Sequence, residues 1–394
     1  MQRQKLSDRI QEDFHMEALE KQYVRLEEHT ISGVEYLAPR ARYPRLHGKN
    51  AIRGYHGFGG TVEAVRLHTD RGACGWASIS GSYQAAKEAK ELILGRKLTD
   101  IFRPDIGILA NELLPFDLAL HDLAGRILEI PVCRMIKPEA AQSVRVYDGA
   151  IYMNDIIPED RPMGIDKILE DCAGDYELGY RDMKVKVGRG HQWMGHKEGL
   201  LRDIEVVREI SRSFPQVRLL ADANDGYTLE DCYAFLTGIG DVSLYWFEEP
   251  FRESVADNTK LKEFMRLHTP ATLLADGESM TDIPLLFELA EKRLLDIWMP
   301  DVCDYGFTAW RKLLKELEQL GYLGSPHAWG QVLKTHYCAH LAAAYPQNVP
   351  IIEGVLGNTE GVNDEGYKVT EGIMKIPMTP GFGMDLVWAP NSLR

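Results

Sequence analysis

The sequence predicts an α/β protein built on a (β/α)8-type barrel, with an additional α+β domain. From about residue 141 to 355, short apolar segments that end in polar residues alternate with helix-like segments, as parallel strands and crossover helices do. The polar strand-end residues recur every 23 to 30 positions, close to the roughly 30 residues that each barrel unit uses. A chain of 394 residues has room for this barrel and a second domain.

The patterns along the chain predict four regions. Residues 1–21 are a polar, partly helical extension. Residues 22–140 form the α+β domain, residues 141–355 the barrel, and residues 356–394 a tail with few helical signals that returns to the first domain.

Within the first domain, the segments at 23–37 and 61–80 are strand-like, and helical periodicity follows at 82–97 and 112–130. Between the two strand-like segments, we expect a loop at 39–60, because this stretch is rich in Arg, Pro, His and Gly.

The composition narrows the possible functions and locations of the protein. The formal net charge of −14 disfavours a nucleic-acid or anionic-membrane surface, but it leaves room for a small anionic substrate in a locally positive site. No apolar run approaches the ~20 residues that cross a bilayer. Met1 to Glu20 lacks the apolar centre of a signal peptide, and the six scattered cysteines are typical of reduced thiols. We therefore expect a soluble cytoplasmic protein.

Lys184 and Lys186 lie two residues apart in DMKVKVG, so both side chains leave one face of the predicted strand. The alternate residues Met183, Val185 and Val187 are apolar and are expected to pack against the helices, which directs the lysines into the barrel. Neighbouring ammonium groups disfavour each other's protonation, and a lysine with a lowered pKa can act as a general base. The alternative interpretation is a solvated lysine pair on an edge strand.

Carboxylates follow the next three apolar segments of the barrel. Asp222 ends LLAD and shares its face with Asn224, Glu248 ends YWFE, and both Asp276 and Glu278 lie in LLADGES. Carboxylates that converge at a barrel mouth repel one another unless a divalent cation neutralises them, and oxygen-only ligation suits Mg²⁺ better than zinc. The sequence therefore predicts a Mg²⁺ site.

Asp301, His327 and Glu353 follow the last three predicted strands. An aspartate and a histidine on adjacent strands can hydrogen-bond, which orients the imidazole and raises its basicity. His327 would lie opposite the lysines in a closed barrel, so we predict it as a second acid or base. Glu353 is a candidate to remain protonated and donate a hydrogen bond to the substrate.

The ordered motifs K-x-K, D-x-N, E-E-P, G-E, M-P-D, P-H and I-E-G resemble those of the mandelate racemase subgroup of the enolase superfamily. The resemblance extends from about residue 22 to the C-terminus. TDRGACGW resembles a strand-turn of that family's capping domain, and ALHDLAGRILEIPV its helix leading to the barrel. The resemblance implies a modified barrel of (β/α)7β form, a capping domain completed by the C-terminal tail, and a homo-oligomer.

For the metal, the resemblance implies Asp222, Glu248 and Glu278 as Mg²⁺ ligands, with Asn224 supporting the site. The segment ADGES blends two family patterns, one ending in Gly-Glu and one in Ala-Asp-Glu. Glu278 is favoured as the third ligand because it follows the glycine, and Asp276 stays open as the alternative.

For proton transfer, the resemblance implies Lys186 as the base on one face of the substrate, tuned by Lys184. The His327–Asp301 dyad would be the acid or base on the other face, and Glu353 would contact the enolic carboxylate. The implied reaction is removal of the α-proton of a carboxylate through an ene-diolate, which Mg²⁺ stabilises.

Three outcomes of that step stay open. Dehydration of a sugar acid, an aldonate or aldarate, to a 2-keto-3-deoxy acid is favoured. The alternatives are racemisation or epimerisation of a 2-hydroxy acid and cycloisomerisation of a sugar lactone or anhydro sugar acid. Oxygen-only strand ends disfavour a zinc hydrolase, and the full set of catalytic residues disfavours a silent barrel.

The loop at 39–60 is expected to cover the barrel mouth and contact the substrate. Its candidate contacts are His47, Lys49 and Arg53. His191 and His196 follow the lysine strand and are further candidates to line the site. His336 and His340 have the i,i+4 spacing of some zinc sites, but we interpret them as ordinary helix residues.

Overall fold

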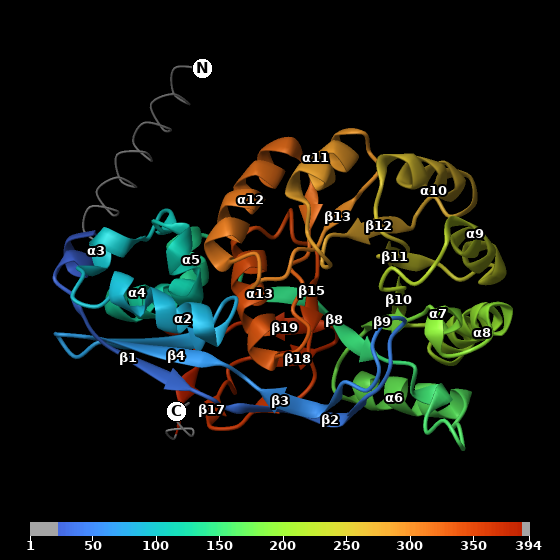
Figure 1. Cartoon of the computed structure of the whole chain (residues 1–394), viewed down its shortest axis with the longest axis horizontal. Coiled ribbons are helices and arrows are strands. Elements are labelled where there is room, and N and C mark those ends of the chain that lie inside the picture. Colours follow the sequence, from blue (N-terminus) through green and yellow to red (C-terminus); the bar gives the residue numbers. More distant parts are fainter. Residues whose placement is uncertain (1–22, 388–394) are drawn as a thin grey trace.

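The computed structural model describes residues 23–387, so the predicted extension at 1–21 lies outside the described residues. Figure 1 shows a barrel surrounded by helices, with a smaller lobe of strands and helices beside it. The last part of the chain lies between the two lobes and beneath the barrel. The predicted α/β barrel with a capping domain is confirmed.

Eight parallel strands form the barrel wall, in the region where the alternating pattern predicted them: β8 (Ser143–Ile151), β9 (Asp182–Lys186), β10 (Arg218–Asp222), β11 (Leu244–Glu248), β12 (Leu273–Asp276), β13 (Ile297–Trp298), β14 (Leu323–Gly324) and β15 (Ile352–Gly354). Seven main helices connect them: α6 (Ile165–Glu177), α8 (His196–Ser213), α9 (Leu229–Gly238), α10 (Val255–His268), α11 (Ile283–Glu291), α12 (Phe307–Leu320) and α13 (Val332–Ala344). Two short turns, η3 (Asn154–Ile156) and α7 (Arg189–Gln192), follow β8 and β9.

The barrel closes between its last strands and its first. β15 pairs in parallel with β8, which also pairs with β9. Between β14 and β15, the Gly324 amide donates to the Asn348 carbonyl at 2.8 Å, and the Ser325 hydroxyl donates to the Ile351 carbonyl at 2.8 Å. The chain therefore forms a (β/α)7β barrel, whose strand ends meet at one mouth.

The barrel helices pack on the strands through an apolar stripe whose residues recur at helical spacing. In α12, Trp310, Leu313, Leu314 and Leu317 are buried at i, i+3, i+4 and i+7. The helix ends at Gly321, whose φ of 73° is the left-handed conformation that glycine adopts most easily.

On β9, the apolar residues Met183, Val185 and Val187 pack in one core cluster with Val206 and Ile210 of α8. Both lysines of that strand are buried and lie on its other face. The predicted orientation of the lysine strand is confirmed.

The capping domain contains a sheet of β1 (Ile31–Leu37), β4 (Ala64–Thr69) and β5 (Cys74–Ser78). Its helices are α2 (Tyr83–Ala89), α3 (Leu98–Ile101), α4 (Asp117–Leu128) and α5 (Val132–Ile136), with η1 (Lys90–Leu92), η2 (Asn111–Phe116), and the pair β6 (Phe102–Arg103) and β7 (Gly107–Ile108). Helix α4 packs on β5 closely enough that a Cβ at Gly75 would meet the Leu123 backbone at 2.3 Å. Residues 23–27 are helical, so the strand predicted from residue 23 starts later, at Ile31.

The predicted loop at 39–60 is wrong in part, because most of it is a hairpin. β2 (Arg40–His47) pairs antiparallel with β3 (Gly57–Thr61), with an irregularity between Arg42 and His47. Pro44 lies in that irregular stretch, where a missing amide proton breaks no ladder bond. Figure 1 shows this hairpin reaching from the capping lobe toward β8 and α6.

The tail forms short strands that join both lobes. β16 (Asn358–Thr359) pairs with β2, and β17 (Val362–Asn363) pairs with β20 (Asp385–Leu386). β18 (Lys368–Thr370) pairs with β19 (Ile373–Lys375), which adds antiparallel to the start of β8. The Trp76 indole of the capping sheet donates to the Met384 carbonyl at 3.2 Å, so the tail also packs on the cap.

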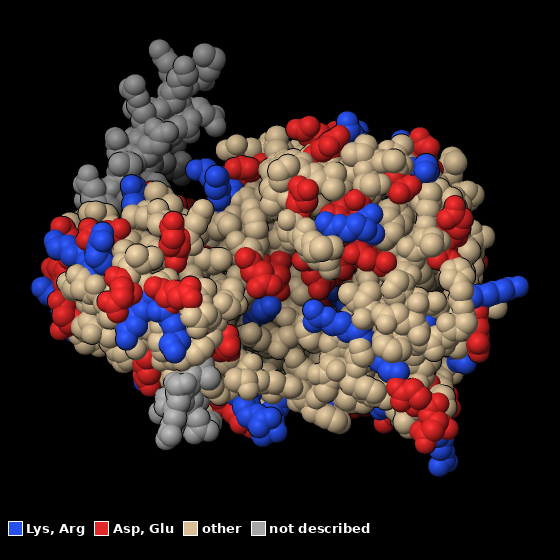
Figure 2. Space-filling model, in the orientation of Figure 1, with Lys and Arg blue, Asp and Glu red and all other residues tan. Residues whose placement is uncertain are grey.

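Figure 2 shows acidic and basic side chains intermixed over one face of the molecule, with no continuous basic field on that face. Among the described residues, no helix combines the length and the apolar character that crossing a membrane requires.

Candidate active site

Three carboxylates converge at the mouth of the barrel. Asp222 ends β10, Glu248 ends β11 and Glu278 follows β12, and each offers an oxygen within 4.8 Å of the others. Asp222 and Glu248 are fully buried, whereas the Glu278 side chain is 23% exposed. Three carboxylate oxygens at this separation fit a hard cation such as Mg²⁺, which prefers oxygen ligands and keeps several waters. We call these residues the acidic triad.

A backbone amide and an indole N–H orient two members of the triad. The Asn224 amide donates to Asp222 Oδ1 at 2.9 Å, and the Trp246 indole donates to Glu248 Oε2 at 2.8 Å. Asn224 itself has a φ of 43°, and its side-chain oxygen is buried without a hydrogen-bond donor among the described residues. Sequence reasoning placed Asn224 near the metal, and the structure places it beside Asp222.

Asp276, the alternative third ligand, lies outside the triad. Its Oδ1 accepts the Gly277 amide at 2.7 Å, and its pKa is raised by burial and by the nearby Glu253 and Asp225. Gly277 has a φ of 115°, so the chain leaves the extended conformation between Asp276 and Glu278. The two carboxylates therefore do not share a face as they would in a continuous strand.

Lys184 is fully buried among carboxylates. Its Nζ lies 2.6 Å from Glu248 Oε1, 3.0 Å from Glu353 Oε1 and 3.3 Å from Asp222 Oδ2. Burial opposes the charged form, but Glu248 and Glu353 outweigh it and raise the Lys184 pKa well above its usual value. The expectation that lysine–lysine repulsion dominates is wrong for Lys184, because carboxylates lie closer to it.

Lys186 lies at one edge of the acidic triad, where its Nζ donates to Asp222 Oδ2. Arg189 fixes the backbone here, since its guanidinium donates to the Lys186 carbonyl at 3.2 Å. Arg189 is itself held by Asp155 and Asp203, and all three side chains are buried. The end of β9 is thus rigidly held while the lysine side chain reaches toward the mouth.

His327 lies at the opposite edge of the triad. Its Nδ1 is 2.9 Å from Asp301 Oδ2, and its Nε2 is 3.2 Å from Glu278 Oε2 and 3.5 Å from Glu353 Oε2. Burial alone would lower the His327 pKa, but Glu278, Glu353 and Asp301 raise it to about 9. The predicted pairing of Asp301 with His327 is present, and it leaves a cationic imidazole at neutral pH.

Asp301 has a second cationic neighbour that sequence reasoning missed. The Nζ of Lys334, in the first turn of α13, donates to Asp301 Oδ2 at 2.8 Å, while the Cys303 and Asp304 amides donate to Oδ1. Lys334 and His327 together hold the Asp301 pKa below its usual range although the side chain is buried. No strand-end signal marks Lys334, because it comes from the helix that follows.

Glu353 is ionised in this arrangement, contrary to the expectation that it stays protonated. Burial would raise its pKa, but the charges of Lys184 and His327 lower it to about 2. The Ala328 amide also donates to Glu353 Oε2 at 2.9 Å.

The candidate substrate contacts from the capping domain have different surroundings. His47 is fully buried and stacks on Tyr43 at 3.9 Å between ring centroids. The Lys49 ammonium pairs with Glu159 and lies over the Trp193 ring at 4.4 Å. For His47 and Lys49 this geometry favours a role in holding the hairpin on the barrel. Arg53 is exposed on the hairpin.

Four further histidines were considered from the sequence. His191 is exposed and lies beside Gly226, in the segment that follows Asp222, and the exposed His196 pairs with Asp231. Their lining of the site stays a prediction. His336 and His340 are buried in α13 against the tail, where they contact Met384 and Tyr367. Their interpretation as ordinary helix residues fits these contacts.

Three further aromatic rings form a series that starts beside Lys186. Tyr152, which directly follows β8, lies with its ring 5.9 Å from Lys186 Nζ. The His56 ring is 4.8 Å from Tyr152 and 4.7 Å from Trp329, which lies two residues after His327. The strand-end rule that found the acids would also have found Tyr152, but sequence reasoning considered only charged and polar residues there.

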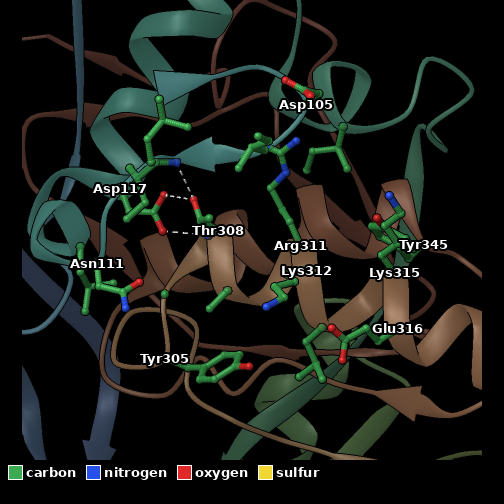
Figure 3. A pocket seen from close by; sticks show the side chains of 18 of the residues that line it. Asp105, Asn111, Asp117, Tyr305, Thr308, Arg311, Lys312, Lys315, Glu316 and Tyr345 are labelled. Carbon is green, nitrogen blue, oxygen red and sulfur yellow. Dashed lines mark hydrogen bonds between the residues drawn. The ribbon is translucent and has the colours of Figure 1, made fainter. Parts of the chain in front are cut away.

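A cavity of about 1010 Å³ lies elsewhere, between the capping domain and α12 (Figure 3). In Figure 3, Thr308 points at Asp117, and its hydroxyl and amide donate to that carboxylate at 2.6 and 2.7 Å. No member of the acidic triad lines this cavity. It is a seam between the two domains.

Comparisons with known proteins agree with this geometry. The sequence profile of the enolase C-terminal domain-like family matches residues 167–389. Galacturonate dehydratase from Geobacillus sp. has been solved as a variant complexed with Mg, with 30% identity, coverage of 92% of this chain and 94% of that one, and a TM-score of 0.85. The same enzyme complexed with D-galacturonate and 5-keto-4-deoxy-D-galacturonate gives 30% identity, coverage of 91% and 95%, and a TM-score of 0.84.

Two curated relatives match at lower identity. D-galactarolactone cycloisomerase from Agrobacterium fabrum is 25% identical over 71% of this chain and 72% of its own length. D-xylonate dehydratase from Haloferax volcanii is 24% identical over 82% of each chain. Dehydratases and a cycloisomerase thus share this chain's fold.

Proposed function

Because the chain belongs to the enolase C-terminal domain-like family, we propose that it is a Mg²⁺-dependent enzyme that dehydrates a sugar acid. The reaction removes the proton next to the substrate carboxylate and expels the hydroxyl on the following carbon. Sugar-acid chemistry is common to its dehydratase relatives, which act on galacturonate and xylonate.

One observation carries the proposal. The acidic triad has a lysine at one edge and a histidine at the other, since Lys186 donates to Asp222 and His327 lies 3.2 Å from Glu278. A carboxylate held over the triad would therefore present its α-carbon between a potential base and a potential acid. A structural charge cluster would have no reason to place these two groups on opposite sides of the acids.

Asp222, Glu248 and Glu278 would hold the Mg²⁺, which supplies Lewis-acid stabilisation of the charge that develops on the substrate carboxylate. Lys186 accepts the α-proton at Nζ. Lys184 stays protonated against Glu248 and Glu353, so it contributes a fixed positive charge beside that carboxylate. Glu353 contributes by orienting Lys184 and His327.

His327 supplies the proton for the leaving hydroxyl. The Asp301 carboxylate, 2.9 Å from His327 Nδ1, favours the protonated imidazole. Nδ1–H donates to Asp301, so Nε2–H is the proton directed toward the triad. A protonated imidazole suits an elimination, in which the leaving group must be protonated.

A racemase or epimerase would instead require His327 to return a proton to the α-carbon, and a cycloisomerase is favoured by the relative that acts on a galactarolactone. Proton NMR in D₂O with Mg²⁺ distinguishes these outcomes. The panel is D-galacturonate, D-xylonate, galactarate and D-galactarolactone, incubated with the unmodified enzyme, with Lys186→Ala and with His327→Asn.

For a dehydratase, a keto-deoxy acid accumulates with the unmodified enzyme. Lys186→Ala then gives neither product nor exchange of the α-proton, whereas His327→Asn exchanges the α-proton but releases little product. Exchange without a keto product, for every acid, would replace dehydration with racemisation or epimerisation. Absence of both, for every acid and the lactone, would contradict the proposal. Oligomerisation and a cytoplasmic location stay predictions from the sequence.

A further inference from the structure

The mouth of the barrel has a charged side and an uncharged aromatic side. The charged side contains the acidic triad, the two lysines and His327. On the other side, the rings of Tyr152, His56 and Trp329 form a continuous series, with centroids 4.8 Å apart for the first pair and 4.7 Å apart for the second. We call these three residues the aromatic wall.

The wall begins beside the proposed base and ends beside the proposed acid. The Tyr152 ring lies 5.9 Å from Lys186 Nζ. Trp329 is attached two residues after His327, and the intervening Ala328 amide donates to Glu353. A substrate that places its α-carbon between Lys186 and His327 would therefore extend its remaining carbons along these rings.

The wall is held in place from both domains. Tyr43 of the capping strand β2 donates its hydroxyl to the Gly330 carbonyl at 2.9 Å, which ties the Trp329 segment to the cap. His47 stacks between Tyr43 and Tyr152, with centroids 3.9 and 5.1 Å away. Tyr152 is buried and supports the series from behind, whereas His56 and Trp329 are half-buried. Their rings therefore present preformed faces, so that binding orders few protein groups.

His56 is an uncharged member with a defined tautomer. Its Nδ1 lies 2.5 Å from the Gly48 carbonyl, so that nitrogen carries the proton and donates it. Nε2 is then an acceptor. Burial, with smaller contributions from Lys186 and Arg53, lowers the His56 pKa to about 4, so the ring stays neutral at physiological pH.

Three nearby cations of the cap and of α13 have partners. Lys49 pairs with Glu159, Arg45 with Asp175, and Lys334 with Asp301. Arg53 of the hairpin is exposed. The wall itself offers uncharged ring faces, the His56 Nε2 acceptor and the Trp329 indole N–H, which is buried with no acceptor among the described residues. Such a surface suits carbon-bound hydrogens and hydroxyl groups, whereas a second carboxylate would need Arg53 as its counter-charge.

We infer that His56 and Trp329 determine the specificity of this enzyme, by binding the neutral, hydroxylated end of a monocarboxylic sugar acid in preference to a dicarboxylic one. This inference rests on the proposed function for the placement of the substrate carboxylate. The ring of Trp329 packs against the carbon chain, and His56 Nε2 accepts a hydroxyl proton.

The test compares kcat/KM and binding for matched acids. The probes are D-galacturonate and D-xylonate, which have neutral ends, and galactarate, a diacid. Isothermal titration calorimetry on the Mg²⁺-loaded protein measures binding independently of turnover. The variants are Trp329→Ala, Trp329→Phe and His56→Phe, and the matched control is Phe58→Ala, an exposed aromatic residue of the same hairpin.

We expect the unmodified enzyme to bind a monoacid at least tenfold more tightly than galactarate. Trp329→Ala should weaken monoacid binding by about tenfold, as expected for one lost ring contact, and Trp329→Phe should retain most of the affinity. His56→Phe keeps a ring but loses the acceptor, so it should weaken monoacids by about tenfold while leaving galactarate nearly unchanged. Phe58→Ala should match the unmodified protein.

Equal monoacid binding in Trp329→Ala, His56→Phe and the unmodified protein would overturn the inference. A preference for galactarate that is removed by Arg53→Gln would also overturn it, since the exposed Arg53 would then recognise a distal carboxylate. If no acid turns over but monoacids bind in a wall-dependent way, the proposed reaction fails while the inference stands. If an acid turns over equally well in the unmodified enzyme, Trp329→Ala and His56→Phe, the inference fails while the proposed reaction stands.

Discussion

Three buried histidines lie within thirteen residues of one another along the chain, but they differ in charge. His327 follows β14 and has its pKa raised to about 9, against burial, by Glu278, Glu353 and Asp301. His336 and His340 lie in α13, and burial lowers both pKa values to about 3. Burial alone therefore makes a histidine neutral, and only converging carboxylates turn a buried histidine into an acid.

The hydrogen bonds explain the difference. His340 Nδ1 accepts the Cys133 amide proton at 3.0 Å, so its Nε2–H donates to the Tyr367 hydroxyl at 2.8 Å. That hydroxyl in turn donates to the Phe382 carbonyl at 2.6 Å. A ring that must accept at one nitrogen cannot be protonated there, so His340 is a structural link between α13, the cap and the tail.

The strongest test of this comparison removes the charge that supports His327. Asp301→Asn should lower the dehydration rate by about 10³-fold, because the imidazolium loses its stabilising carboxylate. It should also destabilise the fold by about 3–5 kcal/mol, since Lys334 becomes a buried, unpaired cation. NMR kinetics and urea unfolding measure the two effects.

The double variant Asp301→Asn with Lys334→Met separates the two effects. We expect it to regain most of the stability and none of the activity, because the unpaired cation is gone but the imidazolium remains unsupported. Recovery of activity in the double variant would show that Asp301 affects activity by pairing with Lys334 and not by stabilising the His327 imidazolium.

His340→Ala should lower the stability of the fold but leave the activity of the folded protein nearly unchanged. Losing this link leaves the Cys133 amide unsatisfied and opens a cavity in a fully buried site, at a cost of about 2–4 kcal/mol of unfolding free energy. The turnover of the folded protein should stay within about threefold of the unmodified enzyme. A large loss of turnover at temperatures where the variant is folded would contradict a purely structural role.

The neutral histidines also predict how stability depends on pH. Their pKa values are lowered from 6.5 to about 3 by burial, so the unfolded chain takes up protons below pH 6.5 and the folded chain does not. This contribution is therefore fully present above pH 6.5 and is lost as pH falls toward 3.

His340→Gln keeps an acceptor and a donor but cannot titrate in this range. Urea unfolding between pH 7 and pH 4 should show a weaker dependence on pH for this variant than for the unmodified protein. Identical slopes would mean that His340 is already protonated in the fold.

The smallest effect is expected at an exposed histidine. The His196 side chain is 67% exposed and pairs with Asp231, so His196→Ala should change stability by less than about 1 kcal/mol. Activity should be unchanged within about twofold, because the exposed side chain contacts Asp231 and no member of the acidic triad in the described structure. A large change in the KM of the substrate would show that His196 contacts the substrate, as the sequence alone suggested.

Much of the architecture could be predicted from local patterns. All eight barrel strands were located because each combines a short apolar run with a polar end, and α12 because its apolar stripe repeats at helical spacing. The hairpin of β2 and β3 was missed, since its Arg, Pro and Gly residues are typical of loops. Its strands are stabilised by partners that sequence patterns do not reveal, including β16 of the distant tail.

The candidate site, too, could be predicted only in part. The residue types at the strand ends could be read from the chain, because alternation along a strand fixes which side chains enter the barrel. Lys334 was missed because it comes from a helix, and Tyr152 and Trp329 because only charged and polar residues were considered near the strand ends.

The sequence by itself determined the barrel and the kinds of chemical group at its mouth, because strand periodicity and strand-end positions are local properties. The tertiary structure decided the ionisation of those groups. Lys184 is a firmly held cation, Glu353 is ionised and His327 is protonated because carboxylates and cations from separate strands meet there. Electrostatic interactions depend on distance in space, and the sequence does not contain those distances.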